Sequence, residues 1–188
     1  MRIIAAALLL AALPASALEV AGVKVADSIT VDGKALVLNG AGLRTRSIFA
    51  VKVYVGALYV TQRSTDAAAI VALDAPRVIR LNLLRDVDKD SMLNAFRDGI
   101  ENNSPGQAAA LAPRLKLVEN SFPPEFKDKQ VLAIAYVPGQ GTTIGVEGGK
   151  TITIEGKDFA DALFRIWIGP KPTDGGLEDL KAALLSGK

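Results

Sequence analysis

The sequence contains no cysteine and no histidine, and aromatic residues make up only 5% of its 188 residues. The absence of cysteine excludes disulfide bonds, thiolate nucleophiles, iron–sulfur clusters and cysteine-ligated zinc. The absence of histidine excludes a Ser-His-Asp triad and imidazole acid–base catalysis, and it leaves only carboxylates and carbonyls as metal ligands. We therefore expect neither a metal nor another cofactor.

Charge of either sign is also limited. The chain has 22 Lys+Arg against 20 Asp+Glu, a formal net charge of +2, which is too small to indicate a nucleic-acid binder. Hydrophobic residues reach 49% and charged residues 22%, a balance typical of a globular core and not of a disordered chain. The length favours one domain.

The N-terminus has the pattern of a secretory signal peptide. Arg2 gives a positive start, an uncharged run extends from Ile3 to Leu13, and Ala15 and Ala17 are small residues at the −3 and −1 positions of a cleavage site. The run is shorter than the about 17–25 apolar residues that span a bilayer. We expect a signal peptide over residues 1–17, a mature domain over residues 18–188 without a membrane span, and a periplasmic location.

Periodicity predicts the secondary structure of the mature domain. Alternating and β-branched runs predict strands at residues 23–25, 29–31, 36–38, 48–60, 78–83, 131–137, 142–146 and 151–155. Helical spacing of apolar residues predicts helices at residues 66–73, 92–100, 108–118, 158–167 and 176–185. This order favours an α+β fold, with one large antiparallel sheet and a layer of helices on one side.

Several local features refine this prediction. Asp32-Gly33 is a hairpin signal, and the glycine pair at residues 40–42 is interpreted as a tight turn between strands. The run at residues 48–60 carries one charge, Lys52, so we expect a central strand that is buried on both faces. Predicted helix N-caps are Ser64 or Thr65, Asp88 or Asp90, and Asp158.

Two residues near the start of the long strand could bind a ligand. Arg44 precedes an apolar strand, and a guanidinium at the mouth of an apolar cavity can hold a carboxylate or enolate in a bidentate fork. The alternative is a surface arginine. Tyr54, on the same predicted strand, is either a core residue or a ligand contact, since a buried hydroxyl needs a hydrogen-bond partner.

These segments resemble a known family. The stretch LNGAGLR at residues 38–44, the strand that follows, and the late LFRIWIGPKP at residues 163–172 are similar to chalcone isomerase-fold proteins, in particular to the bacterial, exported chalcone isomerase-like branch. The resemblance covers nearly all of the mature chain. It implies a large antiparallel sheet, a helical layer and a ligand cleft between them.

The resemblance also implies roles for individual residues. Arg44 matches the arginine of the isomerases and Asn102 matches their asparagine. Tyr54, Ala95 and Ile166 replace the family's hydroxyl-bearing catalytic partners. Fatty-acid-binding members of the fold likewise have an arginine followed by a tyrosine on this strand.

The resemblance therefore implies a non-catalytic binder of a small apolar carboxylate, such as a fatty acid. Arg44 would bind the acidic head, Tyr54 would add a hydrogen bond and Asn102 would line the cleft. One alternative is an isomerase, an intramolecular lyase that uses Arg44 to stabilise an enolate-like charge. The other is a scaffold or partner-binding protein.

Overall fold

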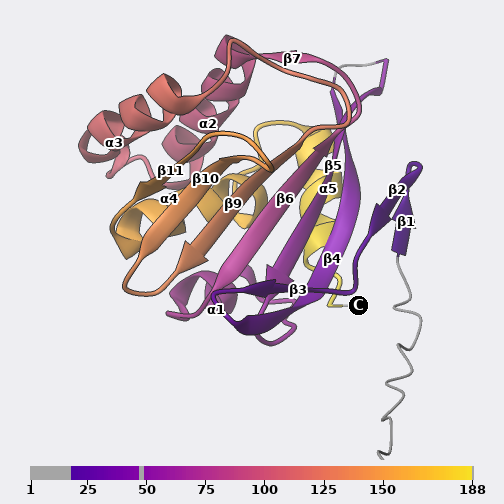
Figure 1. Cartoon of the computed structure of the whole chain (residues 1–188), viewed down its shortest axis with the longest axis horizontal. Helices are drawn as coiled ribbons and strands as arrows, with labels where there is room; N and C mark the ends of the chain where they lie inside the picture. The colour runs from indigo at the N-terminus through magenta and orange to yellow at the C-terminus, as the bar shows by residue number, and fades with distance from the viewer. Residues whose placement is uncertain (1–17, 47–48, 188) are drawn as a thin grey trace, which may run out of the picture.

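The computed structural model describes residues 18–46 and 49–187. The predicted signal peptide and the first residue of the predicted long strand, Ile48, lie outside the described residues. The described chain has the predicted mixed α+β architecture (Figure 1). In the described ranges, no helix is long and apolar enough to cross a membrane.

The described strands and helices follow the predicted order. The strands are β1 (Leu18–Val20), β2 (Val23–Val25), β3 (Ser28–Val31), β4 (Lys34–Arg46), β5 (Val51–Val60), β6 (Arg77–Leu83), β7 (Val87–Asp88), β8 (Glu125–Phe126), β9 (Val131–Val137), β10 (Gly141–Val146) and β11 (Thr151–Ile154). The helices are α1 (Ala67–Ala72), α2 (Lys89–Asn103), α3 (Ala108–Ser121), α4 (Lys157–Ile168) and α5 (Gly175–Leu184).

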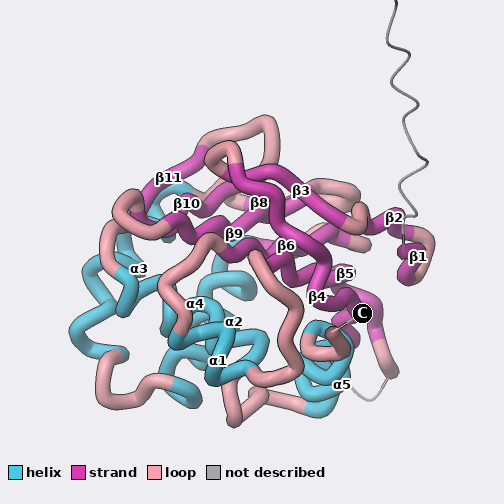
Figure 2. The backbone as a smooth tube through the Cα atoms, turned by 90° about the horizontal axis from the view of Figure 1, so that it is seen from below, coloured by secondary structure: helices cyan, strands magenta, loops and turns pink. Residues whose placement is uncertain are grey.

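Seven strands form one antiparallel sheet in the order β11-β10-β9-β6-β5-β4-β3. The helices pack on one face of this sheet, as Figure 2 shows. Two short pairs, β1–β2 and β7–β8, stand outside it. The antiparallel sheet with a one-sided helical layer confirms the predicted fold class.

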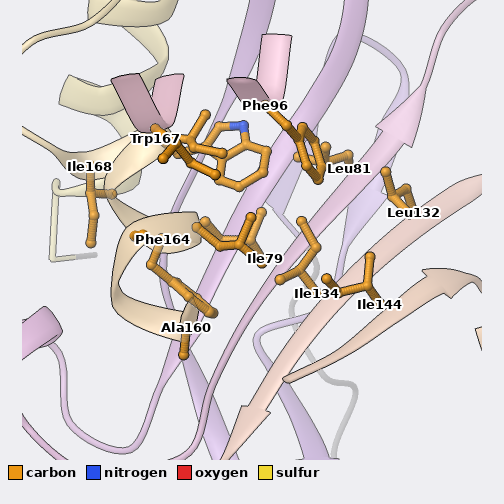
Figure 3. Packing of buried hydrophobic residues seen from close by; sticks show 14 of the residues in the cluster. Ile79, Leu81, Phe96, Leu132, Ile134, Ile144, Ala160, Phe164, Trp167 and Ile168 are labelled. Atoms are coloured by element: carbon orange, nitrogen blue, oxygen red, sulfur yellow. The ribbon is translucent and has the colours of Figure 1, made fainter. Parts of the chain in front are cut away.

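The main core lies between the sheet and the helices. Figure 3 shows Ile79 and Leu81 of β6 facing Phe164 and Trp167 of α4, with Phe96 of α2 beside them. A second, smaller cluster covers the opposite face of the sheet near the β1–β2 hairpin. Burial on both faces explains why the central strand β5 carries a single charge, Lys52, near its exposed start.

Strand β5 begins at Val51, later than predicted, and its first two residues are exposed, but from Tyr54 onward it is buried on both sides as predicted. Tyr54 and Leu58 belong to the core on the helix side, whereas Val55 and Tyr59 belong to the outer cluster. The hairpin predicted at Asp32-Gly33 joins β3 to β4, and both residues have the positive φ angles, 49° and 72°, that a tight hairpin turn requires.

The glycine pair at residues 40–42 is not a turn, and the prediction was wrong. Gly40 and Gly42 lie within β4, where helix α5 crosses the strand. A Cβ atom on Gly40 would lie 2.1 Å from the Ala183 carbonyl oxygen, and one on Gly42 would lie 2.5 Å from the Ala183 Cβ. These glycines have no side chains because the helix packs directly on the backbone of the strand.

The helix caps were predicted in part. Asp88 caps α2 by accepting a hydrogen bond from Ser91 N–H at 2.8 Å, as expected. Asp66, and not the preceding Ser64 or Thr65, caps α1. Asp158 lies in the first turn of α4, whose N-cap is a glycine.

Candidate ligand-binding site

A register shift in β4 decides which way Arg44 points. Before the shift, Leu36 and Leu38 belong to the outer cluster; after it, Ala41 and Leu43 pack there. The shift therefore moves the even-numbered side chains, Arg44 among them, to the helix side of the sheet. β-Bulges commonly re-aim side chains in this way.

Arg44 and Tyr54 lie directly opposite each other on β4 and β5 and are 7% and 8% exposed. The Trp167 indole N–H of α4 donates a hydrogen bond to the Tyr54 hydroxyl at 3.0 Å. Phe96 packs edge-on against Trp167, with ring centroids 5.6 Å apart. Burial raises the pKa of Tyr54, and the hydrogen bond from Trp167 and the charge of Arg44 offset this only in part. The hydroxyl is therefore protonated at neutral pH and can donate a hydrogen bond.

A cavity of about 70 Å³ lies beside these two side chains. It is enclosed by the sheet and by residues of α2, α4 and α5, and most of its wall is apolar. The lining residues are Arg44, Arg46, Val53, Tyr54, Val87, Ser91, Met92, Ala95, Phe96, Ile166, Trp167, Thr173 and Leu177. Four of them also line an outer groove of about 390 Å³: Arg46, Val53, Val87 and Ser91. The cavity therefore adjoins the surface through this groove.

Ala95 and Ile166 both line the cavity. These are the positions at which the resemblance implied lost hydroxyl groups, so the structure places the two apolar replacements beside Arg44 and Tyr54. The hydroxyl groups that remain in the lining belong to Tyr54, Ser91 and Thr173.

Asp174 binds the guanidinium of Arg44 in a bidentate fork. Arg44 Nη1 donates to Asp174 Oδ1 and Arg44 Nη2 donates to Asp174 Oδ2, each at 2.6 Å. Arg44 also donates to the Thr45 carbonyl. Asp174 is the N-cap of α5 and accepts a hydrogen bond from Leu177 N–H at 3.0 Å. We call the Arg44–Asp174 ion pair the α5 clasp.

The α5 clasp keeps Asp174 ionised. Burial raises the pKa of Asp174, but the hydrogen bonds from Arg44 and from the Leu177 amide outweigh burial and lower the pKa overall. Asp174 was not among the residues predicted from the sequence. An aspartate before a predicted helix is a recognisable N-cap signal, but nothing local indicates an ion pair to a residue on a distant strand.

Asn102, predicted to line the cleft, is not among the residues that line this cavity. It is exposed near the end of α2. The neighbouring Asn103 is half-buried, and its amide exchanges two hydrogen bonds with the Lys171 backbone, at 3.0 and 2.9 Å. One position along a helix rotates a side chain by about 100°. Asn103 therefore makes the tertiary contacts: it binds the backbone of the segment after α4 and does not line the cavity.

A second groove lies elsewhere on the surface, and none of the three candidate residues, Arg44, Tyr54 and Asn102, lines it. This groove of about 600 Å³ lies between α2 and α3 and is lined by Ile100, Leu111 and Leu115 with charged residues around them. In the described part of the chain, no group of three or more acidic residues could hold a metal ion.

The family model described as chalcone isomerase-like matches residues 17–186. The chain belongs to the chalcone isomerase-like family. Among solved structures, it is similar to a fatty-acid binding protein from Arabidopsis thaliana, with a TM-score of 0.68 and 18% sequence identity. The match covers 88% of this chain and 94% of that one. At this identity the likeness shows a shared fold. No curated protein matches the sequence.

Proposed function

We propose that the protein binds a small apolar carboxylate, such as a fatty acid, and does not catalyse a reaction. The carrying observation is that Arg44 and Tyr54 lie side by side, buried, at a cavity whose wall is mostly apolar. A carboxylate can receive two charge-assisted hydrogen bonds from the guanidinium and one from the phenol. The remaining wall suits an acyl chain.

Two further observations support this assignment. The α5 clasp demonstrates that Arg44 receives a carboxylate bidentately in this setting. One solved structure of similar fold is a fatty-acid binding protein. Isomerase chemistry is less well supported, because Ala95 and Ile166 carry no hydroxyl group at the two positions where the resemblance implies that the isomerases have one.

Titration calorimetry with laurate tests the proposal. We expect wild-type protein to bind laurate and Arg44→Gln to bind it at least about tenfold more weakly, because a charge-assisted bidentate contact is lost. Arg80→Gln is a matched control, since Arg80 pairs with Glu147 elsewhere on the sheet. Equal binding by Arg44→Gln and the wild type would place the ligand elsewhere, and turnover of a chalcone lost in Arg44→Gln would favour the isomerase.

We also propose that the protein is exported. The basis is the signal-peptide pattern of residues 1–17. Intact mass measurement of protein recovered from a periplasmic fraction should give a chain that begins at Leu18. Recovery of the uncleaved chain from the cytoplasm would contradict the proposal.

A further inference from the structure

Asp174 occupies the position at Arg44 that a ligand carboxylate needs. Both terminal nitrogens of Arg44 donate to Asp174 at 2.6 Å, so the bidentate face of the guanidinium is already used. We infer that Asp174 is an internal competitor that the ligand must displace, and that the first turn of α5 moves when the ligand enters. This inference rests on the proposed function.

The size of the cavity favours such a movement. Its volume of about 70 Å³ is well below the about 300–1,000 Å³ of typical ligand pockets. An acyl chain held inside it needs more room than this. Thr173 and Leu177, on either side of Asp174, line the cavity. Displacement of this segment therefore frees Arg44 and enlarges the cavity at the same time.

Helix α5 is held firmly at one end and less firmly at the other. Near its C-terminus, the Leu184 carbonyl accepts a hydrogen bond from the fully buried Asn39 at 2.8 Å, and Leu180 and Leu184 are buried. At the N-terminus, the Asp174 side chain is 39% exposed, and a Cβ atom on Gly175 would meet nothing within 4 Å. Gly176, in contrast, lies against the Thr45 carbonyl, and Leu177 is buried. The inferred movement therefore starts at Asp174 and Gly175, where glycine allows a wide range of backbone angles, and it separates Gly176 from β4.

The charge of Asp174 then sets the affinity for anionic ligands. Replacement by asparagine preserves the N-cap, because asparagine is an equally good capping residue. It removes the negative charge that competes for Arg44. We expect Asp174→Asn to bind laurate about twofold to fivefold more tightly than the wild type, the range for a partly exposed ion pair.

The experiment compares laurate titrations of wild type, Asp174→Asn and Asp179→Asn. Asp179 is exposed on the same helix, so its variant carries the same charge change outside the site. Asp174→Ser, which also preserves a capping oxygen, is a second variant in case the asparagine form folds poorly. Tighter binding by the Asp174 variants alone supports the inference.

Hydrogen exchange supplies a second measurement on the same proteins. The Leu177 amide, which donates to Asp174, should exchange faster when the wild type is saturated with laurate. Laurate binding of equal strength in all proteins, with unchanged exchange at Leu177, overturns the inference and leaves the proposed function standing. Absence of laurate binding in every protein overturns both.

Discussion

Substitution of Gly40 by alanine tests how closely α5 lies on β4. The added Cβ would lie 2.1 Å from the Ala183 carbonyl oxygen and 2.8 Å from that of Leu184. Both atoms belong to the backbone, so no side-chain rotation relieves the contact. We expect the last turn of α5 to move away from the strand, which also breaks the hydrogen bond from Asn39 to Leu184.

The cost can be worked from these contacts. Overpacking of a close-packed site costs about 1–3 kcal/mol, and loss of one buried hydrogen bond adds about 1 kcal/mol. We therefore expect the free energy of unfolding to fall by about 2–4 kcal/mol, which lowers the Tm of a chain of this length by about 5–15 °C. Thermal unfolding followed by circular dichroism measures the change, and hydrogen exchange should localise it to α5.

Gly106→Ala is the matched control. Nothing lies within 4 Å of a Cβ at Gly106, so the same chemical change should leave the Tm unchanged or slightly raised. A Gly40→Ala protein with the stability of the wild type would refute the direct packing of α5 on β4, and with it the reason given for the glycines.

Three further predictions concern charges and phenols. Asp161→Ala should lower the free energy of unfolding by about 3 kcal/mol, because it removes the ion-pair partner of the buried Arg77. The control Asp158→Ala, at a more exposed pair, should lower it by less than about 1 kcal/mol. Urea unfolding measures both. The folded pKa of Asp174 is lowered, so its ionised form contributes to the free energy of unfolding at neutral pH, and this contribution is lost as the pH falls through that pKa. The difference in unfolding free energy between wild type and Asp174→Asn should therefore vanish in acid. A difference that stays constant with pH would contradict this. Burial raises the pKa of all three tyrosines, that of Tyr136 to about 12, where a hydrogen bond to Asp74 adds to the effect. The stability due to the neutral Tyr136 phenol should therefore be fully present below about pH 10 and be lost as the pH rises to its folded pKa of about 12. Phenolate absorbance of the folded protein should rise above the ordinary pH of tyrosine titration; a full step of all three tyrosines at pH 10 would be inconsistent with their burial.

The fold could be predicted from the sequence because its signals are local. Alternation along β9 and β10, the hairpin residues Asp32-Gly33 and the helical spacing in α2 each depend on neighbours a few positions away. The order of strands and helices then favours one antiparallel sheet with a helical layer. Arg44 and Tyr54 were each singled out from their place at the long apolar strand, and their joint role as ligand contacts came from the resemblance to fatty-acid-binding members of the fold.

Tertiary contacts account for the features that were missed. Gly40 and Gly42 are explained by Ala183, which lies far away in the sequence and next to them in the fold. The role of Asp174 was missed for the same reason, because its partner Arg44 lies 130 positions earlier in the sequence. Asn102 came from the resemblance alone, which does not reveal which side of a helix faces its neighbour; the tertiary contacts are made by Asn103.

A crystal structure of the protein with bound laurate addresses the binding proposal at atomic detail. We predict that the laurate carboxylate lies within hydrogen-bond distance of both the Arg44 guanidinium and the Tyr54 hydroxyl, with the acyl chain along the wall formed by Ala95, Phe96 and Ile166. Laurate bound instead in the α2–α3 groove, with the cavity at Arg44 unchanged, would contradict the assignment of the site.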